Sequence, residues 1–277
     1  MLQQTPVNRV LPVYLAWIDR WPTPARLAAS PAAEALRAWG RLGYPRRALR
    51  LHQAARVIQQ RFGGRVPDDV AELRTLPGVG AYTAAAVAAF AYGKRVVVLD
   101  TNIRRVVTRL TGTASPSPHP TAADYATVDD LLPSDGRRAA RVSLALMELG
   151  ALICTSSSPR CADCPLRSAC RWGGTPTRPR RRPAYRGSDR HARGVILGKL
   201  RDAEGIVPYR DLVAAWPDPV QLARAADSLI ADGLISRSGG GYRLGPASDV
   251  RQISGSAGPP AGPRQPGRRS ASALRGR

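Results

Sequence analysis

Leu76-Pro77-Gly78-Val79-Gly80 is the stretch of this sequence that decides the fold, and Ala81-Tyr82-Thr83-Ala84-Ala85-Ala86-Val87 follows it directly. The two glycines predict a tight hairpin between helices, because glycine adopts positive φ and allows close backbone approach without a Cβ clash. The backbone amides of the hairpin, with those of the helix that starts near Ala81, predict an anion site. An ordinary Gly-rich turn would explain these five residues equally well, so the rest of the sequence has to decide.

An aspartate stands at the start of the next helix. The apolar run Val96-Val97-Val98-Leu99 ends at Asp100, and Thr101-Asn102-Ile103-Arg104-Arg105-Val106 then begins a helix. By default such an aspartate is an N-cap, whose carboxylate accepts hydrogen bonds from the first helical turn. A capped carboxylate is also held in one position, as an electrostatic catalyst requires. The structural and catalytic interpretations of Asp100 are therefore compatible.

All four cysteines of the chain fall in one short segment. Cys154, Cys161, Cys164 and Cys170 form the pattern C-x6-C-x2-C-x5-C. Four thiolates at such short spacing suit either a tetrahedral zinc ion or an iron–sulfur cube. Generic zinc sites usually contain two C-x2-C pairs, and this segment contains one. Disulfides are the weakest alternative, because nothing else in the sequence indicates secretion.

Composition points to a polyanionic partner. The chain of 277 residues carries a formal net charge of +22. Its basic residues are spread along the sequence and are not gathered on one amphipathic helix, which favours nucleic acid over a membrane surface. A base-composition bias of the source genome accounts for part of the arginine excess. No stretch approaches the roughly 20 apolar residues that cross a bilayer, so we expect no membrane partner.

The N-terminal residues contain no targeting signal. Met1-Leu2-Gln3-Gln4-Thr5-Pro6 is polar and lacks the apolar core of a signal peptide. We therefore expect a cytoplasmic protein, and we expect it to act as a monomer.

Apolar spacing predicts an all-α domain over residues 1–153. Helices are expected over residues 6–21, 31–39, 46–62, 67–75, 81–92, 101–111, 121–132 and 136–151. We expect Ser30 to cap the second of these helices. The core of the first helix is expected to contain Val10, Val13, Tyr14, Trp17 and Ile18.

Four segments follow this domain. Residues 154–172 form the cysteine loop, and residues 173–188 read as a basic Pro/Arg linker whose charge can lie along phosphates. Residues 189–245 predict a small unit of helices followed by a hairpin, an order that resembles a winged helix. For this unit, contact with DNA or a partner and simple packing are equally open interpretations. Residues 246–277 have the composition of a disordered basic tail.

Residues 1 to about 172 resemble the adenine DNA glycosylase (MutY-type) family of the helix-hairpin-helix glycosylase superfamily. The segments that carry the resemblance are Met1-Leu2-Gln3-Gln4-Thr5, Leu42-Gly43-Tyr44, Leu76-Pro77-Gly78-Val79-Gly80, Asp100-x-Asn102, Met147-Glu148-Leu149-Gly150-Ala151 and the cysteine loop. The resemblance implies removal of adenine mispaired with 8-oxoguanine or guanine in double-stranded DNA, a step of base excision repair. It also implies that the four cysteines bind a [4Fe-4S] cluster, which we favour over zinc.

The same resemblance implies roles for single residues. Asp100 would face the sugar, while Tyr82 and Asn102 would support the active site. Tyr44 and Gln4 would enter the duplex beside the lesion. The residues implied to contact DNA are Gln3, Gln4, Tyr44, Pro77, Gly78, Val79 and Gly80. Without the family pattern, ordinary structural roles would be the better interpretation of Gln4, Tyr44, Tyr82 and Asn102.

The resemblance also places one catalytic group outside this sequence. Cleavage of the adenine N-glycosidic bond needs a proton donor for the base as well as negative charge near the sugar. The family's glutamate, which acts as the acid, stands just ahead of the motif that starts at Met1 in this chain. We expect that the start has been placed too late, and the alternative is a non-catalytic DNA-binding form. Glu34, Glu72 and Glu148 could substitute, but each suits a structural or solvated position better.

The expected reaction does not include strand cleavage. Relatives of the endonuclease III kind carry a lysine in the helix after the hairpin, which attacks the sugar and forms a Schiff base. Tyr82 occupies that place in this chain, and Lys94 and Lys199 are its only lysines. The sequence therefore predicts a monofunctional glycosylase, and it disfavours a lyase for oxidised pyrimidines.

Overall fold

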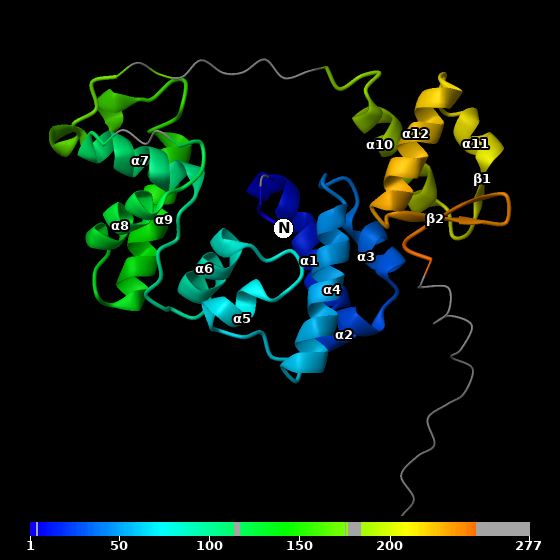
Figure 1. Ribbon diagram of the computed structural model, residues 1–277, viewed down its shortest axis with the longest axis horizontal. Helices are drawn as coiled ribbons and strands as arrows, with labels where there is room; N and C mark the ends of the chain where they lie inside the picture. The colour runs from blue at the N-terminus through cyan, green and yellow to red at the C-terminus, as the bar shows by residue number, and fades with distance from the viewer. Residues whose placement is uncertain (4, 114–116, 175, 177–183, 248–277) are drawn as a thin grey trace, which may run out of the picture.

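The structure is a computed structural model that describes residues 1–3, 5–113, 117–174, 176 and 184–247. Within these residues the chain is mostly helical, with one small sheet near the C-terminus (Figure 1). The helices are α1 (Val7–Arg20), α2 (Pro24–Ala29), α3 (Ala32–Trp39), α4 (Arg46–Arg61), α5 (Val70–Arg74), α6 (Ala81–Phe90), α7 (Thr101–Thr111), α8 (Ala122–Leu131), α9 (Gly136–Leu152), α10 (Asp189–Asp202), α11 (Tyr209–Val213) and α12 (Pro219–Ala231). The predicted helical fold is confirmed.

Side-chain caps fix where the helices of the central region begin. Asp100 accepts hydrogen bonds from two first-turn amides of α7, and Asp135 accepts one from α9. Thr121 and Asp124 form a reciprocal capping box at the start of α8. Each carboxylate or hydroxyl satisfies amides that have no partner inside the helix. These caps explain why the predicted starts of α7 and α9 coincide with the observed ones.

The start of α3 differs from the sequence prediction. Ser30 does not cap this helix, because its hydroxyl donates to the Arg26 carbonyl and accepts a hydrogen bond from the Trp21 indole at 2.7 Å. Pro31 stands at the N-cap position of α3 instead. The unpredicted helix α2 brings Arg26 and Ser30 together one turn before α3.

The first helix buries a narrower face than its sequence indicates. Val10 and Trp17 are buried as predicted, whereas Tyr14 and Ile18 are 47% and 44% exposed. The prediction of a core position was therefore wrong for these two residues. The apolar residues of α1 extend around more of the helix than its neighbours cover.

The helices divide into two lobes around α5 and α6, as Figure 1 shows. One lobe contains α7, α8, α9 and the cysteine loop, and it has its own core around Ile103, Val106 and Val128. The other lobe contains α1 to α4. A separate core that includes Leu73, Leu76 and Ala84 joins α4, α5 and α6. The hairpin between α5 and α6 thus lies between the two lobes.

The C-terminal elements form a winged-helix-like unit. Its order is α10, β1 (Val207–Pro208), α11, α12, β2 (Ile235–Ser238) and β3 (Gly241–Leu244), and its antiparallel sheet has the strand order β1-β3-β2. Gly241 is required where β3 meets β1, because a Cβ there would come within 2.3 Å of the Val207 carbonyl oxygen. The unit packs against α3 and α4, at the end of the molecule opposite the cysteine loop (Figure 1).

Several sequence predictions fall outside the described residues. They are the lesion contact of Gln4, the expected linker at residues 175 and 177–183, and the tail from residue 248 onward. Across the part of the chain that the structure describes, no helix has the length and apolar character needed to span a bilayer.

Candidate active site and cysteine loop

The two glycines of the hairpin Leu76–Gly80 have different roles. The backbone requires glycine at position 78, whereas Gly80 is the N-cap of α6. Gly78 has φ +79°, and a Cβ there would come within 2.7 Å of the Arg50 Cβ. Gly80 is extended with φ −89°, and nothing lies within 4 Å of the position its Cβ would occupy. The expectation of positive φ or close packing at both glycines was therefore wrong for Gly80. As the N-cap of α6 it gives no side-chain cap, so the exposed first turn of α6 leaves its amides open to a ligand.

Asp100 is the N-cap of α7 and is held by three donors. Its Oδ1 accepts from the backbone amides of Asn102 at 2.9 Å and Ile103 at 2.7 Å. Its Oδ2 accepts from the side-chain amide of Asn102 at 3.0 Å. These three hydrogen bonds fix the direction of the carboxylate. Asp100 is partly exposed, so it lies at the surface of the lobe that contains α7.

A second layer of hydrogen bonds holds Asn102. Its Oδ1 accepts from Nη2 of Arg105 at 2.7 Å, and the same nitrogen donates to the Gly150 carbonyl at 2.6 Å. Nε of Arg105 donates to the Cys154 carbonyl at 2.7 Å. With a donor on one side of the Asn102 amide and an acceptor on the other, only one amide orientation satisfies both neighbours. Asp100 is therefore connected to the cysteine loop through Asn102 and Arg105.

Gly150 permits the close contact of α9 with α7. A Cβ at this position would come within 2.7 Å of the Asn102 Cβ and 2.9 Å of the Asn102 carbonyl oxygen. The sequence placed Gly150 in a family motif without giving it a task. In the structure its missing side chain lets the backbone of α9 approach the residue that orients Asp100.

Tyr82 lies in the first turn of α6, within the electrostatic reach of Asp100. Its hydroxyl is 3.9 Å from the Met147 sulfur, and 36% of the residue is exposed. Burial, with the negative charge of Asp100 in addition, raises the pKa of the Tyr82 phenol. The next residue, Thr83, accepts a 2.6 Å hydrogen bond from the side-chain amide of Gln3. The structure thus places Gln3, Tyr82 and Asp100 in one region.

Tyr44 occupies a strained turn before α4. It has φ +48° and is the one non-glycine residue with positive φ in the described ranges, and it is 61% exposed. A residue with a Cβ is uncommon in this region and costs conformational energy there. The preceding carbonyl, that of Gly43, accepts a hydrogen bond from the Trp39 indole at 2.9 Å. We call Gly40–Pro45 the tyrosine loop.

The four cysteines line a single small cavity. Cys154, Cys161, Cys164 and Cys170 share it with Arg109 and Trp172, among others. All four are free thiols of intermediate burial, so the weakest alternative from the sequence, a disulfide, does not occur among them. No group of three or more His, Cys, Asp or Glu side chains in the described residues is placed to hold one metal ion.

Arg109 connects α7 to the cysteine cavity. It is buried, and its guanidinium donates to the Cys154 sulfur at 3.3 Å and to the Thr155 carbonyl at 2.8 Å. The same group stacks on the Trp172 ring at 4.2 Å. Among the described residues no carboxylate forms an ion pair with it. A buried cation needs a compensating negative charge, and thiolates at the cavity would supply it.

The sequence analysis missed Arg105, Arg109 and Gly150. The two arginines lie four residues apart on α7, so one face of this helix presents both to the cysteine loop. That spacing was the available signal, but in a chain with so many arginines it did not stand out.

The acidic residues considered as substitute proton donors have other contacts or positions. Glu34 forms ion pairs with Arg20 and Arg37 on the lobe that contains α1 to α4. Glu72 lies in the first turn of α5. Neither contacts Tyr82 or Asp100.

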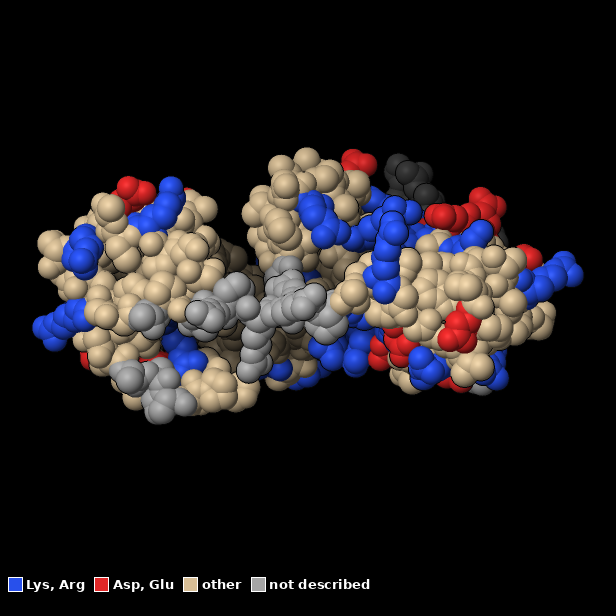
Figure 2. Space-filling view, turned by 90° about the horizontal axis from the view of Figure 1, so that it is seen from above, with Lys and Arg blue, Asp and Glu red and all other residues tan. Residues whose placement is uncertain are grey.

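Basic side chains cover both lobes. Figure 2 shows lysine and arginine side chains at both ends and in the middle of the face in view, with fewer acidic ones between them.

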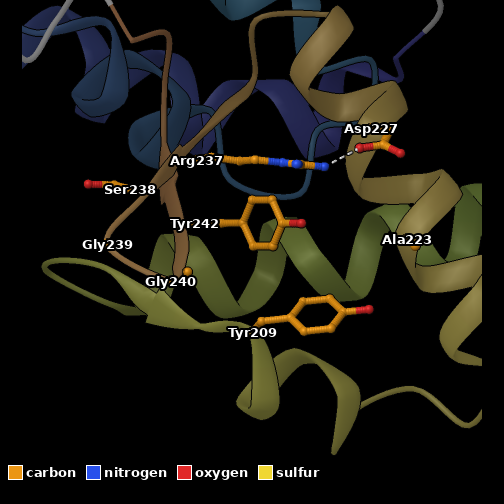
Figure 3. A pocket seen from close by; sticks show the side chains of 9 residues that line it. Tyr209, Ala223, Asp227, Arg237, Ser238, Gly239, Gly240 and Tyr242 are labelled. Atoms are coloured by element: carbon orange, nitrogen blue, oxygen red, sulfur yellow. Dashed lines mark hydrogen bonds and ion pairs between the residues drawn. The ribbon is translucent and has the colours of Figure 1, made fainter.

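A second cavity, of about 490 Å³, lies on the C-terminal unit between Tyr209, Tyr242 and the ion pair of Arg237 with Asp227 (Figure 3). None of the predicted site residues lines it, so it is separate from the region around Asp100.

Comparison with known proteins agrees with this arrangement. The profile of the HhH-GPD superfamily of base excision DNA repair proteins matches residues 1–128. The adenine DNA glycosylase of Mycolicibacterium smegmatis is 53% identical over 246 residues, which cover 87% of this chain and 83% of that protein. The adenine DNA glycosylase of Mycobacterium tuberculosis is 51% identical over 245 residues, covering 86% and 80%. A trapped endonuclease III–DNA covalent intermediate matches with TM-score 0.55 and 27% identity, over 61% of this chain and 78% of that one.

The fold and the site define a helix-hairpin-helix DNA glycosylase of base excision repair. Within that class, the chain belongs to the adenine DNA glycosylase family. Because only 187 residues precede Ser188, the 246-residue alignment with the M. smegmatis protein extends into the winged-helix-like unit.

Proposed function

We propose that this chain hydrolyses the N-glycosidic bond of adenine mispaired with 8-oxoguanine or guanine in double-stranded DNA. The observation that carries the proposal is the carboxylate of Asp100, which three donors fix and whose charge acts on Tyr82, in the helix that follows the hairpin. Excision of a base requires the nucleotide to leave the stack, and charge then develops on the sugar. A carboxylate that is already oriented stabilises that charge without reorganisation.

Asp100 acts on the sugar, and its neighbours keep it in position. Asn102 directs Oδ2 of Asp100, and Arg105 directs Asn102. A tyrosine phenol is neutral at physiological pH, and burial with the charge of Asp100 raises the pKa of Tyr82 further, so its hydroxyl can donate a hydrogen bond in the region of Asp100. Protonation of the adenine is the other requirement of the reaction.

The hairpin and the tyrosine loop bind the duplex. The Val79 amide donates to the Leu76 carbonyl at 3.1 Å, so the amides of Gly78, Gly80 and the first turn of α6 are the ones that suit a DNA phosphate. Tyr44 presents an exposed aromatic ring that can stack on bases, and Gln3 presents an amide near α6.

The glycosylase is monofunctional. Lys94 forms an ion pair with Asp68 at 2.7 Å, and hydrogen bonding to Asp68 raises the pKa of Lys94. Lys94 is thus engaged with Asp68, and Tyr82 stands in the helix after the hairpin, where lyases of the endonuclease III kind carry their nucleophilic lysine. We expect no trapped protein–DNA adduct with borohydride on an A·8-oxoguanine duplex, and efficient trapping would contradict this part of the proposal.

The cysteine loop holds a [4Fe-4S] cluster through Cys154, Cys161, Cys164 and Cys170. The four thiols line one cavity, yet no three ligands among the described residues are placed around a single ion. A cube of iron and sulfide is larger than one ion, so its ligands stand farther apart than those of tetrahedral zinc. When bound, the cluster supplies a covalent connection between the segments of the loop. Iron and acid-labile sulfide in the purified protein support this assignment, and stoichiometric zinc would contradict it.

The decisive experiment is adenine release under single-turnover conditions from an A·8-oxoguanine duplex, with alkali to reveal abasic sites. We expect Asp100→Asn to slow release by roughly 100-fold or more, because it removes the charge that stabilises the transition state. Asp135→Asn is the matched control, since Asp135 is also an N-cap aspartate but lies at the start of α9. Tight binding of the lesion duplex without release by the unsubstituted chain would replace hydrolysis with a binding role.

A further inference from the structure

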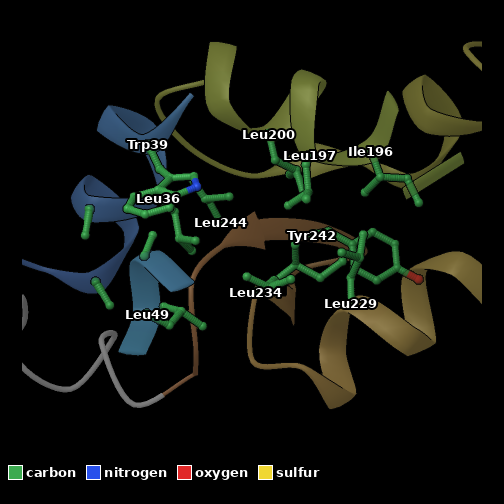
Figure 4. Packing of buried hydrophobic residues seen from close by; sticks show 14 of the residues in the cluster. Leu36, Trp39, Leu49, Ile196, Leu197, Leu200, Leu229, Leu234, Tyr242 and Leu244 are labelled. Atoms are coloured by element: carbon green, nitrogen blue, oxygen red, sulfur yellow. The ribbon is translucent and has the colours of Figure 1, made fainter. Parts of the chain in front are cut away.

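The winged-helix-like unit shares one hydrophobic core with the helices that carry the tyrosine loop. Buried residues of α1, α3 and α4 and buried residues of the unit belong to the same cluster. Figure 4 shows Leu244 of β3 beside Leu36 and Trp39 of α3, with Leu200 of α10 above them. The unit therefore packs against the buried face of α3.

Trp39 connects this shared core to the tyrosine loop. The residue is 1% exposed, and its indole N–H donates to the Gly43 carbonyl at 2.9 Å. Gly43 itself has φ +86° and directly precedes Tyr44 with φ +48°. A left-handed conformation at a residue with a Cβ persists only where surrounding contacts hold it. The Trp39 hydrogen bond is one such contact, and the position of Trp39 depends on the core around it.

Trp39 also reaches the segment that contains Gln3. The guanidinium of Arg47 lies over the Trp39 ring at 5.5 Å and donates to the carbonyls of Gln3 at 2.6 Å and Met1 at 2.9 Å. The indole of Trp39 is thus the common support of Tyr44, which is proposed to contact the lesion, and of Gln3, which is proposed to contact DNA.

Polar contacts at the rim fix the unit in one orientation on α3 and α4. Arg37 of α3 donates to the Ala203 carbonyl at 2.8 Å, and Arg201 of α10 donates to the Leu36 carbonyl at 3.3 Å. Arg46, two residues after Tyr44, forms an ion pair with Asp232 at 3.2 Å. These bonds run in both directions across the interface, so the unit cannot slide along α3 without breaking them.

Three arginines of the unit form ion pairs within it. Arg224 pairs with Asp189, Arg237 with Asp227, and Arg193 with Asp232. Acidic partners reduce the attraction of these arginines for phosphates. Of the two interpretations left open by the sequence, contact with DNA or a partner and packing, the contacts favour packing.

We propose that residues 188–245 are a positioning element for lesion recognition, which holds Tyr44 and Gln3 in their reading conformation through Trp39. The proposal rests on the proposed function, in which Tyr44 and Gln3 contact the duplex. In this proposal the unit does not contact DNA itself. It supports discrimination of the opposite base by holding the tyrosine loop in position.

The test measures affinity for an A·8-oxoguanine duplex and for a matched A·T duplex, using the full chain, and divides the Kd for the matched duplex by the Kd for the lesion duplex, so that a lower ratio means a weaker preference for the lesion. Trp39→Phe keeps an aromatic ring but loses the N–H that binds Gly43. Its matched control is Trp21→Phe, which loses an indole hydrogen bond to Ser30 in the same core. We expect Trp39→Phe to lower the ratio by about fivefold, the effect of one hydrogen bond, and Trp21→Phe to leave it unchanged.

A second pair of variants tests the unit itself. Leu244→Ala leaves a cavity where the unit packs against α3. Leu212→Ala leaves a cavity at another buried position, on α11, which packs on β1 and α12 within the unit. Both should lower the melting temperature, and only Leu244→Ala should also lower the Kd ratio. Equal ratios for the two leucine variants, or for the two tryptophan variants, would overturn the proposal.

Tyr44→Ala separates this inference from the function on which it rests. We expect it to abolish the preference for the lesion duplex. A preference that survives Tyr44→Ala would overturn the lesion-reading role of Tyr44 itself, whereas its loss combined with unchanged ratios in Trp39→Phe and Leu244→Ala would overturn only the positioning role of the unit.

Discussion

The side of the molecule that carries Tyr44 and the side that carries Asp100 are held in place by different forces. On the reading side, formed by α1 to α4 and the winged-helix-like unit, a large apolar core containing several tryptophans supports the loop. On the catalytic side, formed by α7 to α9 and the cysteine loop, arginine side chains connect Asp100 to the backbone around Cys154. The core of the catalytic side is smaller and contains no aromatic residue among those described.

This difference implies that different changes destabilise the conformation of the two sides. Apolar packing is non-directional, so the reading side tolerates conservative substitutions that preserve volume. The hydrogen-bonded connection on the catalytic side is directional and depends on the conformation of a loop with little regular structure of its own. The catalytic side should therefore be the more sensitive to loss of the proposed [4Fe-4S] cluster.

The largest effect is expected from Cys164→Ser. Loss of one thiolate should release the cluster and loosen the cysteine loop, and adenine release should fall by roughly 100-fold or more. The reading side should survive, because Trp17, Trp21, Trp39 and Trp216 lie in its separate core. Iron content, single-turnover release and tryptophan fluorescence measure the three effects. Ser168→Ala, in the same loop, is the control. Unfolding of both sides together in Cys164→Ser would contradict the claim that separate contacts stabilise them.

A smaller loss is expected from Arg105→Met. The substitution removes the donor to Asn102 and to two carbonyls of the segment that leads into the cysteine loop. Supporting residues of this kind typically contribute a factor of about 10 to 100 to activity, so we expect adenine release to slow within that range while iron content is retained. Arg160→Met, at an exposed ion pair with Asp163, should change release by less than about twofold.

The titration of Tyr82 provides an intermediate test. Burial and the charge of Asp100 raise the pKa of Tyr82, so its phenol should ionise above the usual value of about 10. Removing the charge with Asp100→Asn should lower the pKa of Tyr82, because burial alone then remains. The difference spectrum at alkaline pH between the native protein and Tyr82→Phe isolates this residue. An unchanged pKa in Asp100→Asn would show that Asp100 does not act on Tyr82.

The smallest effect is expected from Asp232→Asn. It breaks the partly exposed ion pair with Arg46 near the tyrosine loop and the ion pair with Arg193 inside the unit, and pairs of this kind contribute little. We expect the Kd ratio between lesion and matched duplexes to fall by no more than about threefold. Asp227→Asn breaks a comparable pair with Arg237 inside the unit and should leave the ratio unchanged. A larger fall for Asp227→Asn would contradict the assigned interface.

The sequence predicted the local structure of both sides well. Asp100 is both a cap and a fixed carboxylate, and the helix boundaries of α7 agree with the prediction, because capping and periodicity are local properties. The hairpin glycines were recognised, although only Gly78 needs positive φ. The three helices and the final hairpin of the winged-helix-like unit also followed from turn residues and apolar spacing, whereas β1, which pairs with β3, was not predicted.

The contacts between distant segments could not be predicted. Nothing local in Trp39 indicates that its indole binds the tyrosine loop while residues near the C-terminus surround it. Likewise, the exposure of Tyr14 and Ile18 depends on how far the neighbouring helices extend over α1. Arg105 and Arg109 differ from the other arginines only through what the cysteine loop places next to them.

One experiment tests the separation of the two sides most directly, namely adenine release and the Kd ratio measured on Arg105→Met and Trp39→Phe in parallel. We predict that Arg105→Met slows release from the bound A·8-oxoguanine duplex while the Kd ratio stays unchanged. We predict that Trp39→Phe lowers the Kd ratio while the rate of release at saturating protein stays unchanged. If each variant lowered both quantities, the reading side and the catalytic side would act as one unit, and their independent support by core packing and by arginine hydrogen bonds would be contradicted.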